Sequence, residues 1–436
     1  MKKDTGRALS LSVYTEMGFL PMCTSFVEHG ALAFGLDERG ATALTLAVEE
    51  IFSYLCRISS PDRGVTIRSS SRRYYNLVEI SCPVKDFDMR LFNLTARVSA
   101  EDETALEQMG LLIASRFVDR LNVTQGPDNG ILLSLVKEKS YPEADQIMTM
   151  HPKEVSRFSL IRPQPELLKI ITTAVKALYP PYLFPKAFLY PGKVVDMVEG
   201  GEYEALAATG PDGSVGGALL WHWVSEKTVE CFGPYLFGQA KGSAISGELM
   251  EACIGAIAKS PALGLVSLLP TDELPREHFE DLGTLTLFDE KGNGTALTAY
   301  FRQMHEDPGA YSWCHPELEP FLRSQYGRLA MPREILFVRD LGETKSPFSV
   351  LSVNIERSGN KATIRPVRSG KDMQENLIGH LSLLKKESLK NVFFVMDLGI
   401  PWQTEFTHPL LQSGFSPRVV VPYGGEGDQV IFQLGA

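Results

Sequence analysis

The stretch between Val229 and Ala258 constrains the fold of this chain most strongly, because it predicts a strand and a helix joined by a short turn. Residues 229–237 are apolar and aromatic, which is typical of a strand. After the turn, apolar residues recur at the spacing of one helix face: Ile245, Leu249, Met250, Cys253, Ile254 and Ile257. The turn is therefore expected where a strand ends and a long amphipathic helix begins.

The turn itself, residues 239–244, reads Gln-Ala-Lys-Gly-Ser-Ala. Small side chains let a ligand come close to the backbone, and the free N–H groups at the start of a helix attract anions. Strand, turn and helix together form a candidate cradle for a phosphate or a diphosphate. The alternative interpretation is an ordinary tight connection between a strand and a helix.

This stretch resembles the acyl-CoA-binding turn of the GNAT acyltransferase superfamily, whose motif is Q/R-x-x-G-x-G/A. Gln239, Gly242 and Ala244 fall on its three fixed positions. The resemblance implies that the chain binds acetyl-CoA or another acyl-CoA, with Gln239, Lys241 and Gly242 nearest the phosphates. The implied cofactor-binding residues are Phe237, Gly238, Gln239, Ala240, Lys241, Gly242, Ser243 and Ala244.

Length and composition limit the classes of protein that remain. A chain of 436 residues is too long for one hydrophobic core and suits about two to four domains. The formal net charge of −10 argues against a broad nucleic-acid surface. No run approaches the roughly 20 apolar residues of a membrane helix, and no apolar segment follows the basic N-terminus as in a signal peptide.

The six cysteines lie far apart in the sequence, and most of them sit in apolar runs. None forms a C-x-x-C pair. This distribution indicates reduced core residues of a cytoplasmic protein rather than a disulfide or zinc framework, so we expect no metal site.

Residues 1–140 predict a first domain with an α/β sandwich fold, in which a mixed sheet carries helices on one face. The expected helices span residues 36–57 and 103–121, and the expected strands span 65–69, 76–84 and 130–136.

This order resembles the histidine-kinase-type ATPase fold in its anti-sigma-factor branch, through the phrases at 46–50 and 108–119. Tyr54 stands where the family has a magnesium-binding asparagine, and a phenol is a poor magnesium ligand. The D-x-G-x-G segment is missing, since residues 85–88 contain no glycine, and Gly110 alone remains of a glycine pair. We expect a degenerate domain that does not hydrolyse ATP-magnesium, although ATP could still bind. Glu49 and Glu50 are interpreted as part of a solvated helix face.

A polar linker is expected at 137–145, followed by a second domain at 150–310. Its predicted helices span 165–178, 245–257 and 272–282, and its predicted strands span 204–209, 216–224, 229–237, 264–269, 284–288 and 295–301. This is the element order of a GNAT fold, and it resembles bacterial proteins that fuse an anti-sigma-type ATPase domain to a GNAT domain. The aromatic, proline-rich loop at 179–193 either lines a pocket or packs over a core.

The resemblance implies attack by a substrate amine on an acyl thioester, which needs a base for the amine proton and an acid for the thiolate. Glu230 and His222 are the candidate bases. The family's usual acid is a tyrosine four residues before a glycine; counted from Gly283, this position holds Phe279, which cannot donate a proton. Alternatively, His222 is a packed or surface histidine between two tryptophans, and Glu230 is an ordinary strand-face carboxylate.

Residues 311–436 repeat the second half of the middle region and predict a third domain, a shortened GNAT-like unit. The segment at 392–398 corresponds to 265–270, and the segment at 408–415 corresponds to 278–283. At 368–372 the cradle position reads Arg-Ser-Gly-Lys-Asp, and Asp372 would repel a diphosphate. We interpret this copy as structural.

The predicted fold class is therefore α/β (α+β): an ATPase-like sandwich followed by tandem GNAT-like units. The first functional hypothesis is an acyl-CoA-binding N-acyltransferase with a degenerate ATPase-like regulatory domain, with no nucleic acid or membrane as partner. The second is a non-enzymatic regulator of the anti-sigma type, whose first domain binds a protein partner of the sigma or anti-sigma class. Its GNAT-like units would then serve as a scaffold or a ligand sensor.

Overall fold

The computed structural model describes residues 7–84, 89–95, 114, 116–125, 130–144, 153–240, 242–289, 291–339, 342 and 344–435. The chain divides into two compact units, residues 1–141 and 142–436. The regions predicted as separate second and third domains lie together in the second compact unit.

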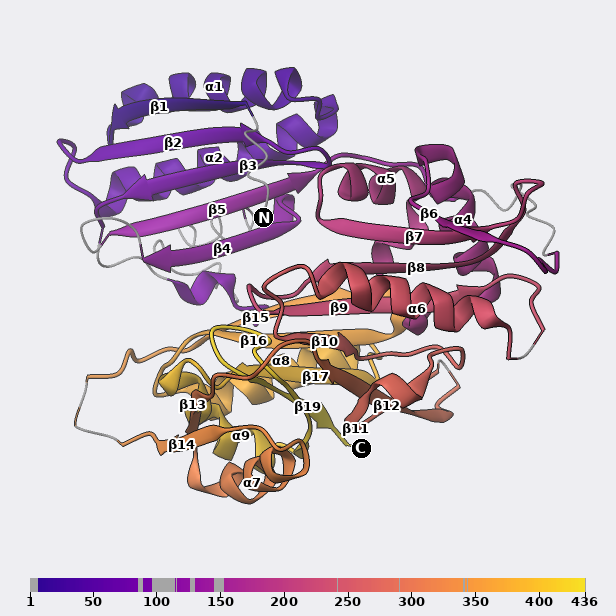
Figure 1. Cartoon of the computed structure of the whole chain (residues 1–436). Coiled ribbons are helices and arrows are strands. Elements are labelled where there is room, and N and C mark those ends of the chain that lie inside the picture. The colour runs from indigo at the N-terminus through magenta and orange to yellow at the C-terminus, as the bar shows by residue number, and fades with distance from the viewer. Residues whose placement is uncertain are drawn as a thin grey trace. The chain divides into compact units, whose positions relative to one another are not determined.

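The first unit is a five-stranded sheet in the order β1-β2-β3-β5-β4, with helices α1 and α2 packed against it (Figure 1). Along β3, alternate residues are buried, which places Val78, Ile80 and Cys82 in the core under the helices. The elements are β1 (Ala8–Tyr14), α1 (Leu20–Ala33), α2 (Glu38–Ile58), β2 (Gly64–Ser71), β3 (Tyr75–Cys82), β4 (Arg120–Gln125) and β5 (Ile131–Glu138), with short 3-10 turns at Met17–Phe19 and Met89–Phe92.

The helix predicted at 36–57 and the strands predicted at 65–69, 76–84 and 130–136 are confirmed. The sheet differs from the prediction, because every described strand pair in it is antiparallel rather than mixed. Strand β1 and helix α1 were not predicted.

Most of the helix predicted at 103–121 lies outside the described residues, as do Gly110 and residues 85–88. Its last two predicted residues, Arg120 and Leu121, belong to strand β4 instead. Tyr54, predicted at the asparagine position of an ATPase, has 7% of its surface exposed and packs into the core. Glu49 and Glu50 are half-buried on α2.

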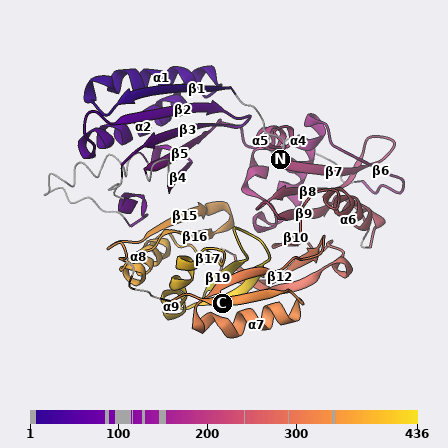
Figure 2. The same cartoon turned by 60° about the vertical axis from the view of Figure 1, so that its left-hand side comes forward.

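The second unit begins with a seven-stranded sheet in the order β6-β7-β8-β9-β10-β12-β11 (Figures 1 and 2). Its strands β9 and β10 run parallel, joined by helix α6, and the other pairs are antiparallel. The elements are β6 (Ser159–Ile161), α4 (Pro165–Leu178), α5 (Pro191–Glu199), β7 (Tyr203–Thr209), β8 (Val215–Trp223), β9 (Thr228–Leu236), α6 (Ala244–Ile257), β10 (Gly264–Ser267), β11 (Glu280–Phe288) and β12 (Gly294–Gln303).

The helix predicted at 272–282 is wrong. Only a short 3-10 turn, Arg276–His278, forms there, and β11 begins at Glu280. In the strand, Leu282, Leu285 and Leu287 become buried, and this tertiary burial outweighs the local helical pattern. Phe279 therefore has an extended backbone rather than a helical one, and its ring packs edge-on against Tyr300.

The rest of the unit contains a five-stranded sheet in the order β15-β16-β17-β19-β18, with β16 and β17 parallel and joined by helix α8. This repeats the order β8-β9-β10-β12-β11 of the first sheet, in which α6 joins the parallel pair. A parallel pair of strands, β13 and β14, was not predicted. The elements are β13 (Ala310–Cys314), α7 (Glu319–Arg328), β14 (Arg333–Phe337), β15 (Val350–Glu356), β16 (Lys361–Arg368), α8 (Met373–Lys386), β17 (Asn391–Asp397), α9 (Thr407–Gln412), β18 (Phe415–Val421) and β19 (Gln429–Leu434).

Side-chain amides join the two sheets of the second unit. Asn391 accepts from the Phe288 N–H at 2.7 Å and donates to the Phe288 C=O at 2.9 Å. Gln433 accepts from the Thr286 N–H at 3.0 Å and donates to the Thr286 C=O. Each amide bonds both polar groups of one residue on the outer edge of β11, so the two sheets are held in one register.

The buried side chain of Arg333, at the start of β14, joins the segment between β12 and β13 to the segment before β19. The side chain of Arg333 is fully buried and bonds Asp428 at 2.7 Å and Asp307 at 2.8 Å. The Tyr423 hydroxyl donates to Asp307, and the Tyr423 ring lies 4.4 Å from the Arg333 guanidinium carbon. Burial raises the pKa of Asp307, but the hydrogen bonds from Tyr423 and Arg333 outweigh it and hold the pKa below its usual value.

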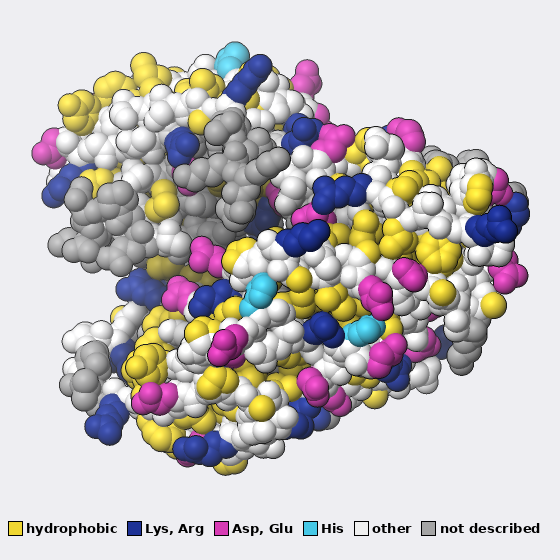
Figure 3. Space-filling view, in the orientation of Figure 1, with side chains coloured by type: hydrophobic (Ala, Val, Ile, Leu, Met, Phe, Trp, Pro, Cys, Tyr) yellow, Lys and Arg dark blue, Asp and Glu magenta, His cyan; other side chains and the backbone are white. Residues whose placement is uncertain are grey.

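No helix of the described residues is long and apolar enough to cross a membrane, and no cluster of acidic, histidine or cysteine side chains among them could hold a metal ion. On the face shown in Figure 3, lysine and arginine side chains are interspersed with acidic ones.

We expect Arg333→Met to lower the free energy of unfolding of the second unit by about 3–5 kcal/mol, because it leaves two buried carboxylates without a cation. Arg323→Met is the matched control: Arg323 forms an exposed ion pair with Glu319 on α7 at 2.7 Å, and its loss should cost less than about 1 kcal/mol. Urea titration followed by circular dichroism measures both. Equal losses in the two variants would contradict the stabilising role of the buried cluster.

Candidate functional site

The site begins where strands β9 and β10 part. They pair only from Thr228 to Glu230 on β9 and from Gly264 to Val266 on β10. Strand β10 ends at Ser267, whereas β9 continues to Leu236. The edge of β9 from Cys231 to Leu236 that faces away from β8 therefore has no strand partner among the described residues, and it is here called the parted edge.

Two side chains of the same unit bond the parted edge. The Thr271 hydroxyl donates to the Pro234 C=O at 2.8 Å. The Tyr179 hydroxyl accepts from the Leu236 N–H at 2.7 Å, and its own proton lies within reach of the Leu236 C=O at 3.2 Å and of Glu273 at 3.1 Å. Burial, together with Glu273, raises the pKa of the Tyr179 phenol, so this hydroxyl stays protonated. A hydroxyl that both accepts and donates here occupies the place that a ligand amide could take.

The turn after β9 is partly open and partly structural. Phe237 is fully buried, and its N–H donates to the Gly216 C=O. Gln239 turns inward: its side chain accepts from the Val155 N–H at 3.1 Å and donates to the Lys153 and Phe237 carbonyls at 2.9 and 2.6 Å. These bonds hold Gln239 away from the solvent side on which a phosphate was predicted.

The rest of the turn presents backbone to solvent. Gly238, Ala240, Gly242 and Ala244 are exposed, and the N–H groups of Gly242 and Ala244 form no hydrogen bond within the described residues. Gly238 and Gly242 have φ of +64° and +84°, which favours glycine at both positions.

Ser243 caps α6 by accepting from the Ile245 N–H at 3.4 Å. Lys241 lies outside the described residues. The predicted cradle is thus a turn with unbonded amides at the start of a 14-residue helix.

Glu230 and His222 are brought together as a cross-strand pair of β9 and β8, with the His222 Nε2 atom 3.3 Å from a Glu230 carboxylate oxygen. Val229 and Cys231, the chain neighbours of Glu230, are buried under α6, so Glu230 points to the opposite face of the sheet. The His222 ring stacks on Tyr203, with the ring planes 9° apart and the centroids separated by 5.0 Å. This stacking and the carboxylate fix the imidazole in one orientation.

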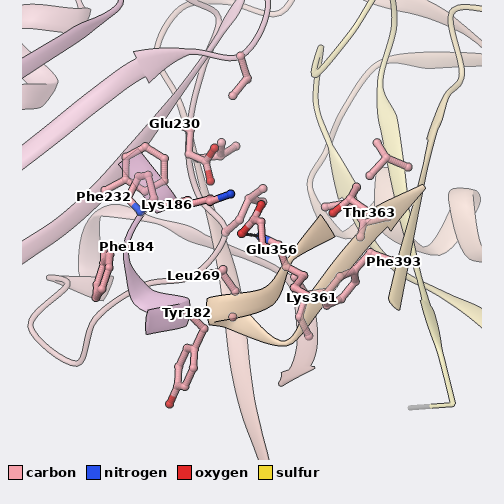
Figure 4. A pocket seen from close by; sticks show the side chains of 18 of the residues that line it. Tyr182, Phe184, Lys186, Glu230, Phe232, Leu269, Glu356, Lys361, Thr363 and Phe393 are labelled. Atoms are coloured by element: carbon pink, nitrogen blue, oxygen red, sulfur yellow. Dashed lines mark ion pairs between the residues drawn. The ribbon is translucent and has the colours of Figure 1, made fainter. Parts of the chain in front are cut away.

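A pocket of about 560 Å³ lies on this face, between the two sheets of the second unit (Figure 4). One wall is the loop at 181–186, part of the aromatic segment predicted either to line a pocket or to pack over a core. A second wall is the first sheet, with Glu230, His222 and Phe232. The third wall is the second sheet, with charged residues of β15 and β16.

Sequence reasoning missed the third wall. Lys361, Thr363 and Arg365 alternate along β16 with the buried residues Ala362 and Ile364, a pattern typical of a solvent-facing strand surface. The sequence offered one hint, which is that the polar face of β16 carries two cations, Lys361 and Arg365, in a region interpreted as structural. Only the packing of one sheet on the other shows that it faces a cavity.

The second cradle, at 368–372, is closed by its own chain. The Lys371 N–H donates to the Ser346 C=O at 2.9 Å, and the Asp372 carboxylate accepts from the Ser349 N–H. A side chain at Gly370 would overlap the backbone of Phe348. The segment 346–349 therefore lies against the place that the turn at 239–244 leaves open in the first copy.

Several solved acetyltransferases align with about a third of this chain. A candidate acetyltransferase of Salmonella typhimurium, solved with its cofactor acetyl-CoA, covers 35% of this chain and 96% of its own, with 15% identity and a TM-score of 0.31. A GNAT-superfamily phosphinothricin acetyltransferase from Sinorhizobium meliloti, in complex with acetyl-CoA, covers 34% and 88%, with 14% identity and a TM-score of 0.25. A GNAT-family N-acetyltransferase from Escherichia coli, in complex with CoA, covers 36% and 86%, with 17% identity and a TM-score of 0.25.

Identities and TM-scores this low do not assign an activity to the chain. No protein-family model matches it, and no curated protein is similar to it. The solved structures lend no support to an ATPase-type first domain or to a sigma-factor partner, and both stay predictions.

Proposed function

We propose that the second unit binds an acyl-CoA and transfers the acyl group to a primary amine. The observation that carries this proposal is the parting of β9 from β10 directly before a turn with unbonded amides. A parted edge offers N–H and C=O groups to an extended ligand, and the start of a helix favours a diphosphate. Strand β9, which carries the parted edge, also carries Glu230, and Glu230 lines a pocket together with the imidazole of His222.

The turn fits such a ligand as it stands, whereas the parted edge would have to open first. The unbonded N–H groups of Gly242 and Ala244 would hold phosphate oxygens, and the positive end of the α6 dipole would favour their charge. Along the parted edge, Leu236 would bond an amide of the ligand only after the Tyr179 hydroxyl has left it. When bound, an acyl-CoA would supply an activated acyl group as a thioester.

Glu230 is the proposed base. Its carboxylate is within hydrogen-bond reach of His222 and lines the pocket. It would take the proton that the substrate amine loses as nitrogen bonds to the acyl carbon, and His222 would orient it. Phe279 provides no proton for the leaving thiolate, so that proton would come from solvent.

The closed state of the parted edge favours a second candidate. Because Tyr179 and Thr271 already bond it, the second unit could instead be a ligand sensor whose pocket binds a small molecule without chemistry. The partner predicted for the first unit would then receive the signal.

Thermal unfolding in the presence of acetyl-CoA tests the binding step, and Ala244→Asp is the variant of choice. An aspartate in the first turn of α6 is compatible with the helix dipole but repels a diphosphate. We expect acetyl-CoA to raise the melting temperature of the wild type and to leave that of Ala244→Asp almost unchanged.

Ala258→Asp adds the same charge at the exposed opposite end of α6 and should keep the wild-type response to acetyl-CoA. The proposal is lost if acetyl-CoA leaves the melting temperature of the wild type unchanged at millimolar concentration. A parallel measurement with ATP-magnesium reports on the first unit.

We expect Tyr179→Phe to bind acetyl-CoA more tightly than the wild type, because the ligand no longer competes with the hydroxyl for Leu236. The ligand-free variant should be less stable by about 1–3 kcal/mol, since buried polar groups lose their partner. Titration calorimetry and urea unfolding measure the two effects.

Tyr326→Phe is the matched control, because its buried hydroxyl bonds the Ser312 hydroxyl at 2.8 Å, and neither residue belongs to the parted edge or lines the pocket. It should lose stability without gaining affinity. If a folded Tyr179→Phe variant binds acetyl-CoA no better than the wild type, the hydroxyl does not block the ligand.

We expect Glu230→Gln to slow acyl transfer by about 10²–10⁴-fold while leaving acetyl-CoA affinity unchanged, because an amide cannot accept the amine proton. Thiol release from acetyl-CoA in the presence of an amine acceptor measures the rate. Glu226→Gln, at an exposed position of the β8–β9 hairpin, should behave as the wild type. A normal rate in Glu230→Gln would remove the carboxylate from the mechanism.

A further inference from the structure

The charges in the pocket are not balanced. Glu356 and Lys361 pair at 3.1 Å, and Glu230 lies against His222. Two further cations line the same cavity, Lys186 from the loop at 181–186 and Arg365 from β16. Neither forms an ion pair with another described residue. In Figure 4, Lys186 and Glu230 come from the loop and the first sheet on one side of the pocket, and Glu356 and Lys361 come from the second sheet on the other side.

We infer that this pocket takes an amphipathic amine that also carries a carboxylate, of amino-acid to dipeptide size, and that Arg365 and Lys186 bind the carboxylate. This inference rests on the proposed function in one respect only: the pocket is taken to be the site of the acyl acceptor. The ligand class itself follows from the charges, walls and volume of the cavity.

Arg365 lacks a partner for a physical reason. The carboxylates that act on it electrostatically belong to Asp397 and Glu230. The carboxylate of Asp397 is already bonded by three backbone N–H groups, those of Gly399 at 2.9 Å, Glu426 at 2.8 Å and Gly427 at 3.0 Å. The Arg365 side chain is exposed where it lines the cavity, so the carboxylate of a ligand that enters the cavity can reach its guanidinium.

An arginine also fits the shape of a carboxylate, because its guanidinium donates two parallel hydrogen bonds. Lys186 comes from a different segment and would add a second, less directional positive charge. Lys361 would contribute little, because Glu356 already neutralises it.

Glu230 would bind the amine of the same ligand. Two carboxylates line the pocket among the described residues, and Glu356 is paired with Lys361. Glu230 has no lysine or arginine within 4 Å, and its partner is the imidazole of His222. An ammonium beside it would be held by charge, and the amine that forms on proton loss would be in place to react.

The rest of the pocket lining is largely apolar, which favours a ligand with an apolar body. This part of the lining includes Tyr182, Phe184, Phe232, Leu268, Leu285 and Phe393. A cavity of about 560 Å³ exceeds what one amino acid fills and is within the range of small-molecule sites. A hydrophobic dipeptide fits this volume better than a simple amine.

Calorimetric titration of the full chain without acyl-CoA tests the inference with matched ligands. L-leucyl-L-leucine should bind at least about tenfold more tightly than its C-terminal amide, which lacks only the negative charge. N-acetylation of the dipeptide, which removes the positive charge, should weaken binding similarly. Equal binding of acid and amide overturns the inference, and so does an absence of binding at millimolar concentration.

Arg365→Gln should reduce the preference for the acid over the amide to near unity. Arg357→Gln is the matched control: Arg357 pairs with Glu387 at 2.8 Å on the exposed surface and does not line the cavity, so its preference should stay that of the wild type. An Arg365→Gln variant that melts as the wild type and keeps the full preference contradicts the assignment. The acid–amide comparison on the wild type stands even if the variant does not fold.

The two proposals fail separately. Dipeptide binding without any acetyl-CoA binding would remove the acyltransferase proposal and keep the ligand class. Acetyl-CoA binding with transfer to simple amines, and no preference for a carboxylate, would keep the transferase and remove the ligand class.

Discussion

The parted edge of β9 is the constraint on which the site depends. A buried strand edge without a neighbour carries N–H and C=O groups that must find other partners, because leaving each unbonded costs about 1–3 kcal/mol. In this chain Thr271 bonds the Pro234 C=O, and Tyr179 bonds both groups of Leu236. The hydroxyls of Thr271 and Tyr179 thus bond backbone groups that a neighbouring strand would otherwise bond. Side chains can leave such bonds more readily than a paired strand can, so a stable sheet and a usable opening coexist.

Side-chain amides play a similar part at the outer edge of β11, with a different outcome. Asn391 and Gln433 each bond both backbone groups of one residue there, and both amides are fully or almost fully buried. A buried amide that makes two bonds has no competing solvent. This edge therefore joins the two sheets firmly, and the pocket between them has walls whose relative position is fixed.

Much of the second unit could be predicted because its signals are local. The apolar run, the turn at 239–244 and the spacing of Ile245 to Ile257 all lie within one short stretch, and the strand, turn and helix formed as predicted. Glu230 and His222 were predicted as candidate bases from the strand pattern, and the structure pairs their side chains across β9 and β8, while their role stays a prediction. The inward turn of Gln239 depends on the backbone at 153–155, which is 84 residues away from it at Val155. The helix predicted at 272–282 failed for the same reason, because burial of leucines against the second sheet decides that segment.

The repeat explains why the third wall was missed and why it is suited to bind a ligand. In the second copy, β16 pairs with β17 only as far as Ile364 and Phe394, and then the strands part as β9 and β10 do. Arg365 is the first residue beyond the last pair, and it lines the pocket. The first copy delivers Glu230 to the same pocket from the last residue before its own parting. In the second copy, the segment 346–349 closes the turn at 368–372, so no unbonded turn follows the place where β16 and β17 part. This parting instead gives the pocket the guanidinium of Arg365, whereas the first copy gives it the carboxylate of Glu230.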